Sequence, residues 1–257
     1  MLILGITGPI GHGKSTLAKA FMAIDKSAVR FESSTIIAEV ANEWLKNFPK
    51  ELLIDAQNYE ILEAWTTELA IILSKQLQIK VHPEQLLITK KTFKKEPETV
   101  ARLLRYIDLI QQGVVEINSE INDGNKDKNR AILQWLGGFL VIRVGEGIWY
   151  DEIERRIHKA ETDGKSLCLV GGIRYPYDAE VIRRNGGKVA KLVRKDLPAR
   201  DSSDITEAHW QNLEVDTVIK SKASKEALAE MAHAIYEDLL NNDLLPEYDS
   251  EDFQGAV

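Results

Sequence analysis

A phosphate-binding pattern lies near the start of the chain. Residues 8–16 read Gly-Pro-Ile-Gly-His-Gly-Lys-Ser-Thr and match the P-loop pattern G-x-x-x-x-G-K-[ST] in full. Glycines let backbone amides point at phosphate oxygens, and the helix that follows adds a partial positive charge. Lys14 is expected to reach the β- and γ-phosphates, and Ser15 is expected to bind the metal. The sequence therefore predicts ATP and Mg²⁺ as cofactors.

The whole loop is expected to contact the triphosphate. The contacting residues would be Gly8, Gly11, His12, Gly13, Lys14, Ser15 and Thr16. His12 is expected to fill a solvated position of the loop and to take no part in catalysis.

The elements around the loop predict how it is positioned. An apolar run at residues 2–7 favours a buried strand, and residues 14–23 have helical spacing. Further strands are predicted at 28–31, 166–170, 188–193 and 215–219, with helices at 149–160, 176–185 and 225–240. Alternating strands and helices predict an α/β P-loop NTPase fold, with a parallel sheet flanked by helices.

The middle of the chain has a different pattern. Apolar residues recur at helical spacing from residue 36 to residue 110, which predicts a mostly helical insertion over 35–148. The lysine-rich segment 90–97 is expected to be an exposed connection. The core would then comprise 1–34 and 149–245, and the acidic tail 246–257 is expected to be frayed.

Composition narrows the range of partners. The chain has 257 residues and a net charge of −7, so duplex nucleic acid and anionic membranes are not expected partners. No apolar stretch approaches the length of a membrane span, and no secretory signal is recognisable at the N-terminus. The single cysteine, Cys168, lies in an apolar run and is expected to be buried. These features favour a cytoplasmic protein that binds small-molecule nucleotides.

A second group of motifs lies farther along the chain. It begins at Arg130 with Arg-Ala-Ile-Leu-Gln, followed by Gly137-Gly138, Arg143 and Trp149. Residues 169–180 then read Leu-Val-Gly-Gly-Ile-Arg-Tyr-Pro-Tyr-Asp-Ala-Glu, and a Gly-Gly pair follows at 186–187. This order resembles the phage-type deoxynucleoside monophosphate kinases, which carry R-x-x-L-Q…G and D-V-R-F-P-N-E-A-E motifs. The resemblance covers the phosphate loop and residues 130–240, and the segment 35–128 shows no clear motif match.

The resemblance implies an ATP-dependent phosphotransferase acting on a (deoxy)nucleoside monophosphate. Lys14 and Arg174 would be catalytic, and Arg130, Arg143 and Arg174 would bind the acceptor. The helical insertion would form the acceptor side. Residues 194–200, between two arginines, could close over the site as a lid, and residues 204–207 align with a donor-side segment of the family.

One position departs from the family pattern. The motif aspartate falls on Gly172 in this sequence. Glu32, just after the second predicted strand, is the candidate that would supply the missing carboxylate as a catalytic and substrate-binding residue. If so, Gly172→Asp should be tolerated or should raise activity.

Two alternatives remain open from the sequence. The chain could be a kinase of another small acceptor, such as dephospho-coenzyme A or a nucleoside. It could also be a catalytically weak nucleotide-binding regulatory protein, which the loss of the motif aspartate at Gly172 would favour. A homodimer is compatible with either alternative.

Overall fold

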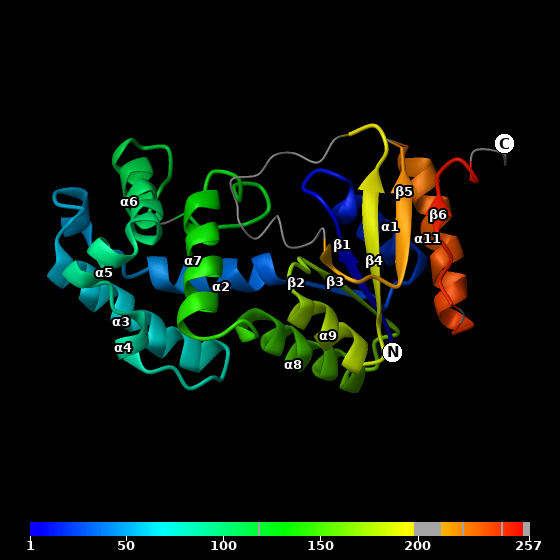
Figure 1. The fold of residues 1–257 in the computed structure, drawn as a ribbon, viewed down its shortest axis with the longest axis horizontal. Coiled ribbons are helices and arrows are strands. Elements are labelled where there is room, and N and C mark those ends of the chain that lie inside the picture. Colours follow the sequence, from blue (N-terminus) through cyan, green and yellow to red (C-terminus); the bar gives the residue numbers. More distant parts are fainter. Residues whose placement is uncertain (118, 198–211, 223, 243, 254–257) are drawn as a thin grey trace. The chain divides into compact units, whose positions relative to one another are not determined.

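The computed structural model describes residues 1–117, 119–197, 212–222, 224–242 and 244–253. The chain forms two compact units (Figure 1). The first comprises Met1–Ser33 and Tyr150–Val257, and the second comprises Ser34–Trp149. The phosphate loop and the Gly172 motif both belong to the first unit.

The first unit is built on a six-stranded parallel sheet with the order β2-β3-β1-β4-β5-β6. Its strands are β1 (Leu2–Thr7), β2 (Val29–Glu32), β3 (Leu167–Gly171), β4 (Lys188–Arg194), β5 (Thr217–Ser221) and β6 (Tyr248–Asp249). β1 lies between β3 and β4, so the loop that follows β1 leaves the sheet near its middle. The predicted α/β fold with a helix-flanked parallel sheet is confirmed.

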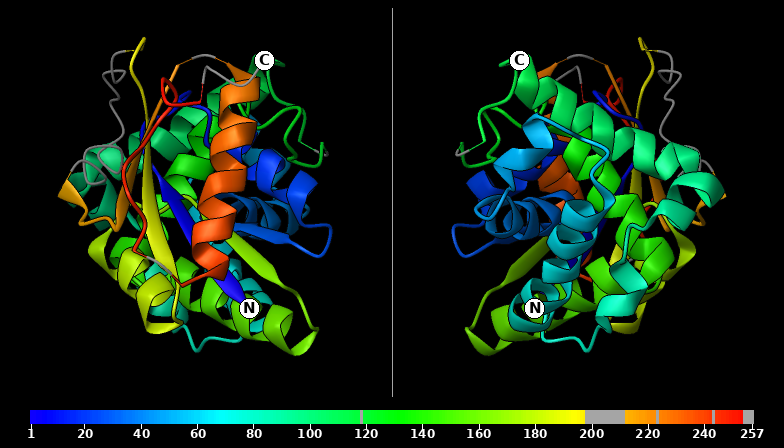
Figure 2. Two further views of the ribbon diagram at one scale, coloured as in Figure 1. Left: turned by 90° about the vertical axis from the view of Figure 1, so that its right-hand side faces the viewer. Right: turned by 90° about the vertical axis from the view of Figure 1, so that its left-hand side faces the viewer.

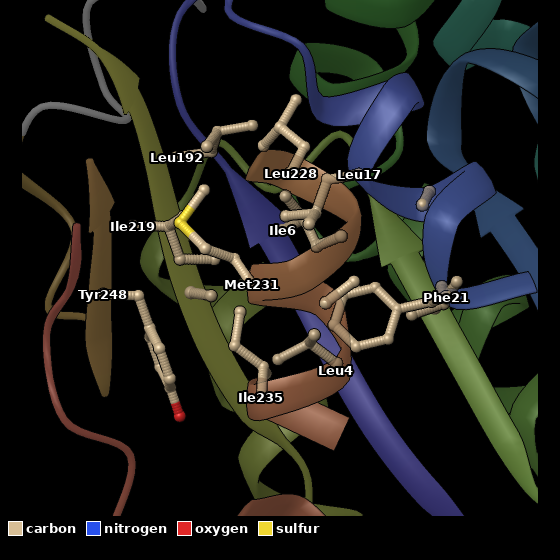
Figure 3. Close-up of a cluster of buried hydrophobic side chains, with 14 of the residues drawn as sticks. Leu4, Ile6, Leu17, Phe21, Leu192, Ile219, Leu228, Met231, Ile235 and Tyr248 are labelled. Carbon is tan, nitrogen blue, oxygen red and sulfur yellow. The ribbon is translucent and has the colours of Figure 1, made fainter. Parts of the chain in front are cut away.

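Helices α1 (Lys14–Ile24) and α11 (Lys225–Leu240) cover one face of this sheet (Figure 2). Alternate strand residues such as Leu4 and Ile219 meet Phe21 of α1 and Met231 of α11 (Figure 3). All four side chains are fully buried. Burial of a large apolar side chain contributes about 1.5–3 kcal/mol, so this cluster fixes the helix that carries the phosphate loop.

Helix α9 (Pro176–Arg184) packs on the opposite face, where small residues make room for it. A Cβ atom at Gly5 would lie 2.5 Å from the Ile173 side chain, and one at Gly187 would lie 2.8 Å from Ile182. The close approach holds the segment between β3 and α9 against β1. Helix α8 (Ile148–Thr162) precedes β3.

The acidic tail differs from the expectation. Tyr248 and Asp249 form β6 beside β5, and the Tyr248 ring is buried. The expectation of a frayed segment was wrong for residues 246–253, because the acidic side chains that suggested a solvated tail are paired with lysines. The pairs are Lys220–Glu247 at 2.6 Å, Lys195–Asp249 at 2.5 Å and Lys222–Glu251 at 2.8 Å.

The second unit is helical. Its helices are α2 (Ser33–Leu45), the short 3₁₀ helix η1 (Lys50–Leu53), α3 (Tyr59–Gln76), α4 (Pro83–Leu86), α5 (Lys90–Lys95), α6 (Pro97–Gln111) and α7 (Arg130–Arg143). The lysine-rich segment is not a plain connection, because Thr89 caps α5 by accepting hydrogen bonds from the amides of Lys91 and Thr92.

Aromatic rings form the core of the second unit. Trp44 stacks on Trp65 with ring centroids 3.8 Å apart, and Trp135 stacks on Phe139 at 4.6 Å. The Trp44 indole also donates a 2.8 Å hydrogen bond to the Trp65 carbonyl oxygen. This core anchors α7, which begins at Arg130 and ends at Arg143.

Candidate active site

The phosphate loop leaves β1 in a conformation that requires glycine. Gly8 has a φ of 130°, and a Cβ atom there would lie 2.1 Å from the Leu192 carbonyl oxygen in β4. The backbone of the loop therefore runs directly against the neighbouring strand. Gly13 has a φ of 96° and caps the N-terminus of α1. The loop thus turns sharply enough to present the first amides of α1 to a ligand.

Lys14 folds back over this loop. Its Nζ donates hydrogen bonds to the carbonyl oxygens of Gly8 at 2.6 Å and Pro9 at 2.7 Å. The ammonium charge therefore lies inside the turn, beside the positive end of α1. An anionic ligand bound at this helix end would face both charges.

From the sequence, His12 was expected to occupy a solvated position, and this expectation was wrong. His12 is 1% exposed, and its Nδ1 accepts a 2.9 Å hydrogen bond from the backbone amide of Arg194. The reason is the sheet order, which places the end of β4 beside the loop that follows β1. His12 therefore ties the phosphate loop to β4.

The proposed lid, residues 194–200, is described only as far as Leu197. Arg194 is described, and its Nε donates a 3.0 Å hydrogen bond to Asp196. Arg200 and the donor-side segment 204–207 lie outside the described residues.

A second charged group lies beside the loop and comes from β2. Arg30 Nη2 donates a 2.9 Å hydrogen bond to Ser15 Oγ and forms an ion pair with Glu32. Sequence reasoning singled out Glu32 but missed Arg30. The available signal was their spacing, because residues two apart in a strand point to the same face.

Gly171 of the neighbouring strand β3 leaves space for the Glu32 carboxylate, because glycine has no side chain. Glu32 pairs in register with Gly171, and a Cβ atom at Gly171 would lie 2.8 Å from Glu32 Oε1. The Glu32 side chain thus lies over the end of β3, close to the position where the family motif has its aspartate.

A side chain at Gly172 would be strained and crowded. Its φ is 79°, and a Cβ atom there would lie 2.4 Å from Ser33 Oγ. This geometry disfavours a side chain at position 172, and the expectation that Gly172→Asp is tolerated stays a prediction. The physical reason is the left-handed backbone conformation together with the close approach of Ser33, neither of which the sequence reveals.

Hydrogen bonds to the backbone of residues 173–175 hold the segment that carries Arg174. Asp178, which is 3% exposed, accepts hydrogen bonds from the amides of Arg174 at 2.8 Å and Tyr175 at 3.0 Å. Thr7 Oγ1, at the end of β1, donates to the Ile173 carbonyl oxygen at 2.9 Å. The segment that carries Arg174 is thereby fixed beside the start of the phosphate loop.

Asp178 and Tyr150 are supporting residues that sequence reasoning left without a role. The Tyr150 hydroxyl donates a 3.1 Å hydrogen bond to the Gly171 carbonyl oxygen, and burial raises the pKa of this phenol well above its usual value. Tyr150 therefore stays neutral and acts as a donor beneath the end of β3. For Asp178, the signal was an acid in the first turn of a helix that starts at Pro176.

Arg130 and Arg143 lie in the second unit, at the two ends of α7. Fourteen residues of helix place them about 20 Å apart. Arg130 pairs with Asp127 at 2.9 Å. Arg143 contacts both carboxylate oxygens of Glu96 at 2.7 Å, and its guanidinium lies 5.5 Å from the Phe139 ring centroid. The two arginines therefore do not converge on one point.

The chain was compared with known proteins. A model of the deoxynucleotide monophosphate kinase family matches residues 3–232, which include both units. A search of curated proteins gives no significant match. In the described part of the chain, no single helix is both long and apolar enough to cross a membrane. Since the family match spans the phosphate loop, the helical unit and the Gly172 motif, the chain belongs to the deoxynucleotide monophosphate kinase family.

Proposed function

We propose that this kinase transfers the γ-phosphoryl group of ATP, with Mg²⁺, to the phosphate of a deoxynucleoside monophosphate. Family membership makes the chain a nucleotide kinase with deoxynucleotide monophosphates as acceptors. The observation that supports the donor site is the loop geometry. The Gly8 backbone lies too close to β4 for any side chain, and Lys14 Nζ lies across the turn.

The loop residues would hold the triphosphate in the following way. Backbone amides of residues 8–16 would donate to phosphate oxygens, and Lys14 would exchange its carbonyl partners for the β- and γ-phosphates. Ser15 would place its hydroxyl oxygen on the metal. A metal ion held there by Ser15 would supply positive charge to offset the charge of the phosphates.

Arg174 and Glu32 would act at the reacting phosphates. Both lie at the carboxyl ends of strands around β1, where open parallel sheets collect their ligands. Arg174 would donate to the transferred group, whose oxygens carry the negative charge. Glu32 would orient the acceptor or metal-bound water.

The reaction needs little acid–base chemistry. An oxygen of the acceptor phosphate attacks the γ-phosphorus, the bond to the β-phosphate oxygen breaks, and ADP leaves with that electron pair. Phosphate monoesters have a second pKa of about 6, so the attacking oxygen is already ionised near neutral pH. Glu32 is therefore proposed to position groups and not to remove a proton.

Glu32→Gln should lower turnover by about 10²-fold, the range typical of a positioned polar group. The amide keeps the size of the side chain but cannot form the ion pair with Arg30. Steady-state kinetics with both substrates saturating would measure this change. Asp151→Asn, on the surface of α8, is a matched control that should leave turnover unchanged. Normal turnover in Glu32→Gln would move the carboxylate role to another residue.

We further propose that the helical unit, with Arg130 and Arg143, forms the acceptor side. Arg143 now donates from Nη2 to both carboxylate oxygens of Glu96. To bind an acceptor phosphate, it would have to exchange this carboxylate for phosphate oxygens, which a guanidinium group also binds well.

Hydrogen exchange would test the acceptor side. A deoxynucleoside monophosphate should slow exchange within residues 34–128 or near residues 130–143, because bound ligand stabilises the elements that contact it. Protection confined to residues 8–16 and 215–222 would contradict this assignment.

The activity itself is tested by coupled ADP release with a panel of deoxynucleoside monophosphates. ADP release that depends on one or more of these acceptors is the expected result. ADP release without any acceptor dependence would mean that the protein is an ATPase and not a kinase.

We place the enzyme in the cytoplasm. Its single cysteine is buried, burial raises its pKa to about 12, and it needs no oxidising environment.

A further inference from the structure

One guanidinium group joins the metal side of the phosphate loop to the carboxylate of β2. The same nitrogen, Arg30 Nη2, donates to Ser15 Oγ at 2.9 Å and pairs with Glu32 Oε1. The side chains of Arg30 and Glu32 are each 23% exposed. The pair is therefore shielded from most solvent but remains accessible to a ligand in the loop.

The two partners of Arg30, Ser15 and Glu32, would respond differently to a metal ion bound at Ser15. A metal ligand must offer an oxygen lone pair, and Mg²⁺ approaches such an oxygen to about 2.1 Å. A guanidinium nitrogen 2.9 Å from the same Ser15 oxygen would lie within about 5 Å of the ion, where like charges repel strongly. Glu32 accepts from the same nitrogen, so Arg30 can leave Ser15 without losing its counter-charge.

We infer that Arg30 is a positioning residue that yields Ser15 to the metal. Without metal–nucleotide, Arg30 holds the Ser15 hydroxyl. When the hydroxyl oxygen binds the metal, the guanidinium turns fully to Glu32 and fixes its carboxylate. Donor binding would thereby order the acceptor-side carboxylate. The inference rests on the proposed role of Ser15 as metal ligand.

Nucleotide affinity measured with and without metal tests this inference. The quantity is the ratio of the ATP dissociation constant in EDTA to that in excess Mg²⁺, measured by calorimetry. Arg30→Gln should raise this ratio about tenfold, because the metal no longer displaces a charge-assisted hydrogen bond. Arg184→Gln is the control. It removes an arginine of α9 that is paired with Glu154 of α8, and it should leave the ratio unchanged.

A second pair of variants separates the inference from the proposed function. Ser15→Ala should abolish most of the metal-dependent gain, and adding Arg30→Gln to it should then have no further effect. If Ser15→Ala keeps the full gain, the assignment of Ser15 as metal ligand fails, and the inference fails with it. If Ser15→Ala loses the gain but folded Arg30→Gln keeps the wild-type ratio, only the inference is overturned.

Arg30→Lys covers the case in which Arg30→Gln does not fold. Lysine keeps the charge but lacks the planar group that bonds Ser15 and Glu32 together. Arg30→Lys should therefore raise the ratio by a smaller factor than Arg30→Gln does. An unchanged ratio in Arg30→Lys would overturn the inference.

Discussion

Lys14→Ala is expected to weaken the binding of ATP·Mg²⁺ by about 10²- to 10⁴-fold, and turnover should fall by at least as much. The size follows from the loss of two hydrogen bonds from a charged donor, each of about 1.5–3 kcal/mol when the acceptor is a ligand phosphate. Turnover falls further because the γ-phosphate gains charge in the transition state.

The fold should survive this change. Lys14 Nζ donates to carbonyl oxygens of the loop, whereas Leu17 and Phe21 hold α1 to the sheet. We therefore expect unfolding free energy to change by about 1 kcal/mol. Calorimetry with ATP and Mg²⁺, together with thermal melting, measures both quantities.

Lys19→Ala is the matched control, because it removes the same charge from an exposed position of the same helix. It should bind ATP almost as the wild type does. Wild-type affinity in a folded Lys14→Ala variant would remove the basis of the proposed donor site.

Gly172→Ala is expected to destabilise the protein by about 2–5 kcal/mol, and Gly172→Asp by at least as much. A left-handed backbone costs a residue with a Cβ about 1–2 kcal/mol, and the contact with Ser33 Oγ adds an overpacking cost of about 1–3 kcal/mol. Urea denaturation would measure the change in unfolding free energy.

Two further variants separate the two costs. Gly186→Ala has the same backbone conformation, with a φ of 78°, but nothing lies within 4 Å of the added Cβ atom. It should show the conformational cost alone. In a Ser33→Ala background, Gly172→Ala should cost only as much as Gly186→Ala, since the nearest remaining atom is 3.6 Å away.

The same series tests the role of the missing aspartate. If Gly172→Asp is as stable as the wild type and more active, the carboxylate belongs at position 172. Equal costs for Gly172→Ala in both the wild-type and Ser33→Ala backgrounds would mean that Ser33 does not limit this position.

The central strands and the phosphate loop could be predicted from the sequence because their signals are local. β1 and β3 are covered on both faces by helices, so they appear as continuous apolar runs. The loop depends on glycine spacing and on the Lys-Ser pair that follows, which are requirements of the backbone and of phosphate chemistry. The amphipathic stripes of α3, α6 and α11 are local in the same sense.

The tail was misjudged because its charge was taken as a sign of solvation. The segment at α5 is exposed as expected, but it is a capped helix and not a plain connection. In the tail, Glu247 is paired with Lys220 of β5, and Asp249 is paired with Lys195, which directly follows β4. In α5, the lysines face outward while Thr92 is buried. Neither arrangement follows from composition alone.

The sequence by itself determined that a P-loop pattern follows the first strand of a parallel sheet, and its motif order determined the resemblance to deoxynucleotide kinases. Only the tertiary structure decided which side chains surround that loop. The sheet order places β2 beside β3, which brings Arg30 to Ser15 and lays Glu32 over Gly171. The same order buries His12 against β4. These contacts join residues 15 to 182 positions apart or depend on a left-handed backbone at Gly172, and neither kind of information is carried by local patterns.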